Sequence, residues 1–253
     1  MPEARGTRAN HQPGEEMAPQ LADALRQHPL VLFDLDDTLC DYSLARMRRL
    51  SHVFTEAFQV HGRELAADEM DELITRSIGM HPHGVDHFPD LLSGYGIGPE
   101  AIGTAQAWYR TNSLRHLALF GEARAALAAV RGRTGGPGYG LGIITNGPAG
   151  IQRRKIELLG VEPLVDFIIV SGEFGVDKPD PSIFREALRR GGVGPGDALY
   201  IGDSAEHDIV GARAAGLTPV WVQRDGAPWT GDGPEPGLRI RNVGEVAAAL
   251  RSA

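Results

Sequence analysis

The first candidates for chemistry are two carboxylates at alternate positions, Asp34 and Asp36, in the run FDLDDTL at 33–39. A carboxylate can act as a nucleophile, as a general acid or base, or as a ligand of a hard cation. Taken alone, such a pair is also typical of a polar turn or a helix cap. The pair therefore indicates a functional site only if other suitable residues lie near it.

Three further clusters carry polar side chains that suit the same chemistry. They are Thr145 and Asn146 in TNG at 145–147, Lys178 in VDKPD at 176–180, and Asp203 and Asp208 in GDSAEHD at 202–208. Each cluster alone is also typical of a turn, a solvated surface or a helix N-cap. Lys178 stands out because only two of the 25 basic residues are lysines, and the other is Lys155.

The elements that must position these clusters alternate along the chain. Short apolar runs predict strands at 29–33, 140–145, 166–170, 198–201 and 218–222, and helical patterns lie between them at 122–131, 150–159, 182–190 and 208–215. Such alternation is typical of a parallel sheet covered by helices on both faces. The clusters fall at the ends of these strands, so we expect all six charged or hydroxyl side chains to converge on one sheet edge.

The stretch 43–115 interrupts the alternation with long amphipathic segments at 46–61, 67–78 and 100–114 and no convincing strand. We predict an inserted helical cap at 43–115, a core domain of 29–42 and 116–253, and a flexible N-terminal tail at 1–28. The insertion follows the loop after the first strand. In open α/β sheets ligands bind at the carboxyl ends of the strands, so the cap is expected to act as a lid there.

Several carboxylates in one pocket repel each other strongly unless cations compensate them. A hard divalent cation and a lysine supply that compensation. Mg²⁺ prefers oxygen ligands and commonly joins one or two carboxylates to a phosphate, which suits Asp34 and Asp203. Lys178 suits a compact positive charge near a phosphoryl oxygen.

The motifs DLDDT at 34–38, TN at 145–146, KPD at 178–180 and GDSAEHD at 202–208 resemble, in order and spacing, the four motifs of the haloacid dehalogenase (HAD) superfamily. The resemblance covers roughly 30–225 and points to its phosphatase branch with a C1-type helical cap. It implies an α/β fold, with a Rossmann-like parallel-sheet core and an inserted helical cap domain.

The resemblance also implies roles for the first pair of carboxylates. Asp34 would be the nucleophile that attacks phosphorus and forms an aspartyl-phosphate. Asp36 would protonate the leaving oxygen and then activate water, while its backbone carbonyl would ligate Mg²⁺. Covalent catalysis of this kind divides one difficult displacement into two easier ones.

The remaining roles are implied in the same way. The Thr145 hydroxyl and the Asn146 backbone N–H would bind phosphoryl oxygens, and Lys178 would neutralise charge on the nucleophile and on the transferring group. Asp203 would be a metal ligand. Asp208 would orient Lys178 or a metal-bound water.

The function implied is a Mg²⁺-dependent phosphomonoester hydrolase acting on a small soluble phosphate ester. A dehalogenase of the superfamily needs neither the acid at Asp36 nor the metal site at Asp203, and Schiff-base phosphonate cleavage needs a cap lysine, which 43–115 lacks. A phosphomutase of the same fold and a non-catalytic phosphate-responsive binding module stay open as alternatives. Sugar phosphates, nucleoside monophosphates, phosphoglycolate and acylneuraminate 9-phosphate all remain candidate substrates.

Composition limits the partners and the compartment. The chain of 253 residues has a formal net charge of −8, which disfavours nucleic acid as a partner. Its single cysteine, Cys40, cannot form an internal disulfide, and no stretch approaches the ~18 apolar residues of a membrane-spanning helix. We therefore expect a cytoplasmic protein without a membrane partner, and composition does not predict its oligomeric state.

The predicted cap also contains an unusual histidine-rich run, GMHPHGVDHF at 79–88. Three histidines, His81, His83 and His87, raise the question of a zinc site. Their spacing matches no standard zinc pattern, and no cysteine lies nearby. Contact with substrate and a packed or solvated loop are the other two interpretations.

Overall fold

A computed structural model describes residues 13–80, 84–132, 140–224, 226 and 228–251. The chain forms two compact units, one made of Met1–Cys40 and Leu119–Ala253 and the other of Asp41–Ala118. Each unit has its own hydrophobic core. Among the described residues, no helix is both long and apolar enough to cross a membrane.

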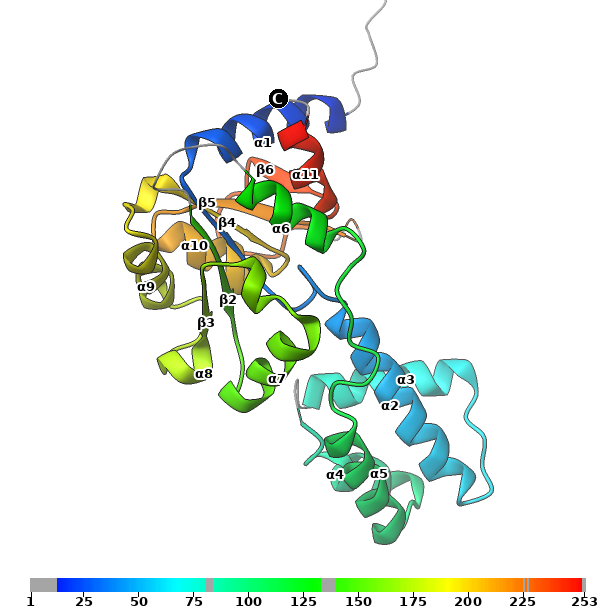
Figure 1. Ribbon diagram of the computed structural model, residues 1–253. Coiled ribbons are helices and arrows are strands. Elements are labelled where there is room, and N and C mark those ends of the chain that lie inside the picture. The colour runs from blue at the N-terminus through cyan, green and yellow to red at the C-terminus, as the bar shows by residue number, and fades with distance from the viewer. Residues whose placement is uncertain (1–12, 81–83, 133–139, 225, 227, 252–253) are drawn as a thin grey trace, which may run out of the picture. The chain divides into compact units, whose positions relative to one another are not determined.

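The first unit is built on one sheet of six parallel strands in the order β3-β2-β1-β4-β5-β6 (Figure 1). The strands are β1 (Leu30–Phe33), β2 (Gly140–Thr145), β3 (Phe167–Val170), β4 (Ala198–Gly202), β5 (Thr218–Val222) and β6 (Leu238–Ile240). The predicted α/β fold with a parallel sheet is confirmed. Strand β6 was not predicted, because it has only three residues and an arginine at its centre.

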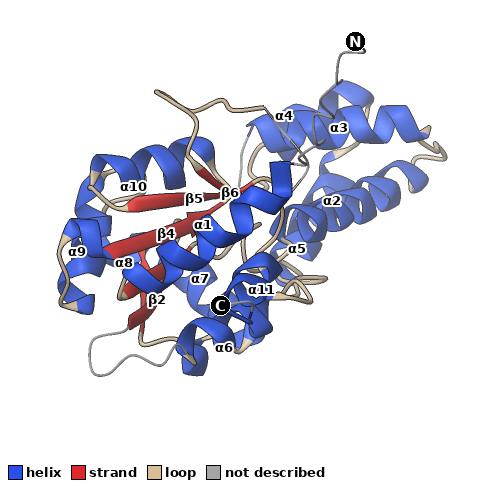
Figure 2. Cartoon of the chain, turned by 90° about the horizontal axis from the view of Figure 1, so that it is seen from above, coloured by secondary structure: helices blue, strands red, loops and turns tan. Residues whose placement is uncertain are grey.

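Helices cover both faces of this sheet (Figure 2). On one face, α9 (Pro181–Gly191) buries Ile183 and Phe184, and α10 (Gly211–Ala214) buries Ala212, in one cluster with Leu30 and Leu32 of β1. On the other face, α6 (Ala123–Arg131) packs against α11 (Gly244–Arg251). Helix α7 (Ala149–Leu159) follows β2, and the short segments α8 (Ser171–Phe174), η2 (Glu162–Leu164), η3 (Pro195–Asp197) and η4 (Ala205–Val210) complete the unit.

The prediction of a flexible tail at 1–28 is wrong for its second half. Residues Pro13–Gln27 form helix α1, which packs against α11 and β6, and Leu21, Ala22 and Leu25 are buried. The signal was weak because these three apolar residues stand among Pro, Glu, Gln and Arg, a composition typical of disordered segments. Residues 1–12 lie outside the described part of the chain.

The second unit consists of helices joined by loops, with no strand among its described residues. It comprises α2 (Tyr42–Gln59), α3 (Ala67–Met80), α4 (Phe88–Leu92), η1 (Ser93–Tyr95) and α5 (Pro99–Thr111). The Asp41 side chain caps α2 by accepting a hydrogen bond from the Leu44 N–H at 3.2 Å. Aromatic and aliphatic side chains from all four α-helices, including Phe54, Phe58 and Phe88, form its core.

The histidine-rich run is described only in part, because His81 and His83 lie outside the described residues. His87 is buried, its Nε2 atom lies 2.7 Å from the Ser77 hydroxyl oxygen, and its ring packs edge-on against Phe88. The interpretation as a packed loop therefore fits His87.

The packing of α1 gives a stability prediction. Leu25 is fully buried, so Leu25→Ala removes apolar contacts and leaves a cavity, and we expect the free energy of unfolding to fall by about 2–4 kcal/mol. Gln20→Ala, on the exposed side of the same helix, is the control and should change it by less than about 0.5 kcal/mol. Denaturant unfolding measures both variants. Equal stability of Leu25→Ala and wild type would contradict the placement of α1 in the core.

Candidate active site

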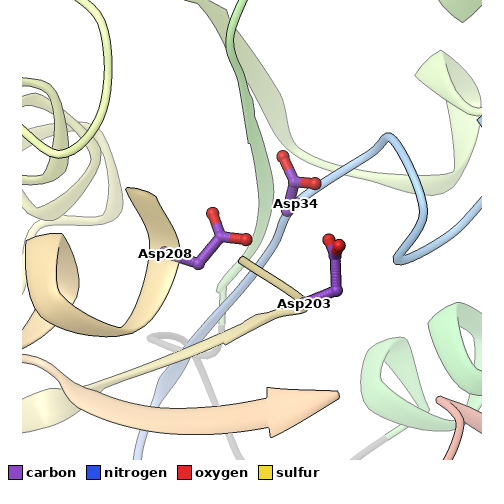
Figure 3. A group of neighbouring side chains, drawn as sticks. All are labelled: Asp34, Asp203 and Asp208. Atoms are coloured by element: carbon purple, nitrogen blue, oxygen red, sulfur yellow. The ribbon is translucent and has the colours of Figure 1, made fainter. Parts of the chain in front are cut away.

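Three carboxylates meet at the carboxyl edge of the sheet (Figure 3). Asp34 directly follows β1, Asp203 directly follows β4, and Asp208 lies in η4. One oxygen from each carboxylate lies within 4.8 Å of the others. The Asp34 N–H donates to the Ile201 carbonyl of the neighbouring strand at 2.9 Å, so the sheet ladder itself fixes the backbone of Asp34.

Lys178 lies among these carboxylates and joins two of them. Its Nζ atom donates to Asp34 Oδ1 at 2.5 Å, to Asp208 Oδ1 at 2.7 Å and to the Tyr200 hydroxyl at 2.9 Å. The side chain is only 3% exposed. All three ammonium hydrogens therefore have acceptors, and the charge is held in one place.

The backbone of Lys178 is tied to the turn after β2. The Asn146 side-chain amide donates to the Lys178 carbonyl at 2.9 Å and accepts from the Lys178 N–H at 2.8 Å. Two residues further on, the Asp180 side chain accepts from the Ser182 N–H at 2.8 Å and caps α9. These contacts fix the loop from which Lys178 projects.

Asp208 has both oxygens engaged by protein groups. Oδ1 accepts from Lys178 and, at 3.0 Å, from the Tyr200 hydroxyl, while Oδ2 accepts from the Ser204 N–H at 2.9 Å. A Cβ on Gly202 would lie 2.4 Å from this carboxylate, so a glycine is required there. These contacts suit the role of a group that orients Lys178.

Asp203 is held at both its side chain and its backbone. The Thr38 hydroxyl donates to Asp203 Oδ1 at 2.9 Å, and the Trp221 indole N–H donates to the Asp203 carbonyl at 2.8 Å. The Thr38 carbonyl in turn accepts from Arg224 at 2.9 Å. The loop after β1 is thus fastened to the loop after β4.

Asp36 and Thr145 lie in a second network on the β2 side of Asp34. Lys155 Nζ donates to Asp36 Oδ2 at 2.6 Å, and Gln152 Nε2 donates to the same oxygen at 3.1 Å and to the Thr145 hydroxyl oxygen at 2.7 Å. Lys155 and Gln152 are both buried. The structure thus brings the predicted clusters to one sheet edge, with each carboxylate held by named protein groups.

Sequence reasoning missed four residues of these networks, namely Thr38, Gln152, Lys155 and Tyr200. A signal existed for Lys155, since it is one of the two lysines in an arginine-rich chain. Gln152 lies three positions earlier on the same helix and so on the same helical face. Tyr200 and Thr38 gave no signal, because an aromatic residue in a strand and a threonine in a turn are ordinary.

The electrostatics reflect crowded carboxylates. Burial, together with the charges of Asp208 and Asp203, raises the pKa of Asp34 well above its usual range, although Lys178 opposes this. Burial and the charges of Asp208 and Asp37 raise the pKa of Asp203 to about 7. Burial lowers the pKa of Lys178, but Asp208 and Asp34 outweigh this, so its pKa is raised and the ammonium stays charged.

The donor set fits a hard divalent cation. The group of Asp34, Asp203 and Asp208 carries three carboxylates against the single charge of Lys178, and burial together with neighbouring carboxylates raises the pKa of both Asp34 and Asp203. Carboxylate oxygens are the ligands that Mg²⁺ prefers. A divalent cation at this edge would supply the compensation.

Cys40 belongs to the packing of this region and not to its chemistry. It is fully buried, and its thiol lies 3.4 Å from the Leu35 carbonyl. Burial and the nearby Asp36 charge raise the pKa of the thiol well above its usual value. A thiol that resists ionisation is a poor nucleophile, so Cys40 acts as a packed small side chain.

The fold and the site together define a class of protein, an α/β enzyme core with acidic residues and a lysine at the carboxyl edge of a parallel sheet, interrupted by a helical unit. The family model of haloacid dehalogenase-like hydrolases matches residues 28–216. The chain therefore belongs to the haloacid dehalogenase-like hydrolase family, and the predicted membership is confirmed.

Relatives of the chain include two phosphatases. The chain is 39% identical over 165 residues to the phosphoserine phosphatase of Thermus thermophilus, an alignment that covers 64% of this chain and 63% of that protein. It is 33% identical over 201 residues to the glyceraldehyde 3-phosphate phosphatase of Methanopyrus kandleri, covering 77% of this chain and 83% of that protein.

A solved structure with the same fold is that of the HAD-hydrolase YfnB from Bacillus subtilis bound to magnesium, which reveals interdomain movement. The two chains are 25% identical, and their superposition covers 88% of this chain and 99% of the YfnB chain with a TM-score of 0.71.

The raised pKa of Asp203 gives a pH prediction for the metal-free protein. Its pKa is about 7 in the folded state and about 3.9 in an unfolded chain, so the folded state binds more protons between these values, and its stability falls as pH rises. Asp203→Asn removes this fall of stability with rising pH, because an amide does not ionise. In EDTA we expect the variant to match wild type near pH 4 and to exceed it by about 1–2 kcal/mol at pH 8. Denaturant unfolding across this pH range measures the difference, and a variant less stable than wild type at pH 8 would contradict it.

Proposed function

We propose that the protein is a Mg²⁺-dependent phosphomonoester hydrolase that acts on a small phosphate ester through an aspartyl-phosphate on Asp34. The observation that carries the proposal is the position of Asp34, which is buried at the sheet edge with Lys178 Nζ 2.5 Å from its Oδ1. Membership of the family and the phosphatase relatives support the reaction type.

The nucleophilic step would use the other oxygen of Asp34. Lys178 fixes Oδ1, so Oδ2 is left to attack phosphorus while the bond from phosphorus to the ester oxygen breaks. Asp36 would give a proton to the departing oxygen. In the second step Asp36 would take a proton from water, which attacks phosphorus, releases phosphate and regenerates the Asp34 carboxylate.

The turn after β2 would bind the transferring group. The Thr145 hydroxyl oxygen accepts a hydrogen bond from Gln152 at 2.7 Å, so its own hydrogen stays available to donate to a phosphoryl oxygen. The Asn146 side chain is used to hold Lys178, which leaves its backbone N–H for the phosphoryl group. Lys178 would stabilise charge that spreads over the phosphoryl oxygens.

The carboxylates of Asp34 and Asp203, with the backbone carbonyl of Asp36, would hold the metal ion. When bound, Mg²⁺ would neutralise negative charge and let an anionic ester approach an anionic nucleophile. Asp208 would act on Lys178 instead, since both its oxygens are already engaged. The magnesium in the related structure supports this choice of metal.

The helical unit at 41–118 is proposed to be the cap that selects the ester, close to the predicted boundaries 43–115. The related phosphatases bear the names of two different esters, an amino acid phosphate and a triose phosphate. Both are small, so a small phosphate ester is the proposed substrate class. The cytoplasmic location expected from the composition stays a prediction.

The nucleophile is tested with Asp34→Asn. An amide cannot form the acyl phosphate, so we expect phosphate release from any ester to fall by at least about 10³-fold with the fold intact. A panel with phosphoserine, glyceraldehyde 3-phosphate, acylneuraminate 9-phosphate and a nitrophenyl phosphate measures this with Mg²⁺ and with EDTA. The control is Asp90→Asn, an exposed carboxylate of the helical unit. Activity of Asp34→Asn close to that of wild type would remove the proposed mechanism.

The acid and base are tested with Asp36→Asn. Without the carboxyl group, both formation and hydrolysis of the phosphoenzyme should slow, by about 10²–10⁴-fold for general acid–base catalysis. Rapid-quench kinetics resolve the two steps. Rates equal to those of wild type in both steps would show that Asp36 moves no proton.

A further inference from the structure

Lys155 and Gln152 hold one oxygen of Asp36 and leave the other toward the reacting group, and we propose that they are positioning residues for the acid–base step. This inference rests on the proposed function, because it assigns a purpose to the residues around Asp36. Lys155 Nζ lies 2.6 Å and Gln152 Nε2 lies 3.1 Å from the same atom, Asp36 Oδ2. Both side chains come from α7, which follows β2.

Lys155 is not an ordinary lysine of a helix surface. Its side chain is 3% exposed, and an ammonium group is costly to bury unless a charge compensates it. It ion-pairs with Asp36, whose side chain is 20% exposed. Both lysines of the chain thus contact carboxylates of the site, Lys178 at Asp34 and Lys155 at Asp36.

Gln152 connects Asp36 to the turn that is proposed to bind phosphate. Its Nε2 atom lies 2.7 Å from the Thr145 hydroxyl oxygen and 2.5 Å from the Asn146 carbonyl, besides its contact with Asp36. Two of these three partners, a carboxylate and a carbonyl, can only accept, so the amide nitrogen must face them, and because it carries two hydrogens, one of these is shared between two acceptors. The acid–base carboxylate and the phosphate-binding turn are therefore fixed relative to each other by one side chain.

The two contacts select which oxygen of Asp36 can work. Because Oδ2 receives both donors, Oδ1 is left to exchange a proton with the ester oxygen or with water. Oδ1 has the Cys40 thiol at 3.6 Å, a weak donor that a proton acceptor can displace. Proton transfer needs close approach, and a misplacement of about 1 Å can cost on the order of 10²-fold in rate.

The test compares esters whose leaving groups differ in their need for a proton. A nitrophenolate departs without protonation, whereas an alkoxide does not. We expect Lys155→Met to slow the first turnover of an alkyl phosphate by about 10²-fold and that of nitrophenyl phosphate by less than about fivefold. Rapid-quench measurement of the first turnover isolates this step. Arg154→Met removes a positive charge from an exposed position of the same helix and should change neither rate.

Thermal unfolding shows whether Lys155→Met folds. If Lys155→Met does not fold, the two esters are compared with Lys155→Gln, whose side chain is a neutral donor. If a folded variant loses first-turnover rate equally on both esters, while wild type is active and Asp34→Asn is inactive, the positioning role alone is overturned. Absence of hydrolysis by wild type, or activity that survives Asp34→Asn, overturns the proposed function and this inference with it.

Discussion

The pairing of Lys178 with Asp34 and Asp208 is the interaction on which the rest of the site depends. Three carboxylates lie close together at the sheet edge, and mutual repulsion at low dielectric would protonate them or push them apart without a compensating charge. Lys178 compensates two of them through contacts of 2.5 and 2.7 Å. The pKa values of Asp34 and Asp203 both stay raised, because burial and the neighbouring carboxylates outweigh the lysine, and a divalent cation would compensate these two groups.

The surrounding structure serves to keep that lysine and its partners still. Asn146 fastens the Lys178 backbone to the turn after β2, Tyr200 and the Ser204 N–H fix Asp208, and the sheet ladder fixes Asp34. The donors are side chains and backbone groups from separate loops that only the parallel sheet brings together. A site assembled in this way has little freedom to rearrange, which suits catalysis by fixed charges.

The parallel sheet and the edge where the site forms followed from the sequence, because apolar runs at 29–33, 140–145 and 198–201 each end in polar clusters, and parallel strands carry such clusters to one edge. Helix α1 did not follow, since the three buried residues Leu21, Ala22 and Leu25 are too few to outweigh a polar composition. The contacts of Lys155 could not be predicted from the sequence either. A lysine is unusual in this arginine-rich chain, but the distance between α7 and the loop after β1 is set by the packing of the fold.

The family and the sheet edge make Asp34 the central residue of this account, and the covalent intermediate on it is the most direct test. Enzyme mixed with ester and Mg²⁺ is quenched in acid during turnover, digested, and mapped by mass spectrometry. We predict a phosphoryl group on the peptide that contains Asp34, present during turnover and lost once substrate is exhausted. Turnover of the ester with the phosphoryl group on another residue, or with none on the enzyme at any time, would contradict the account.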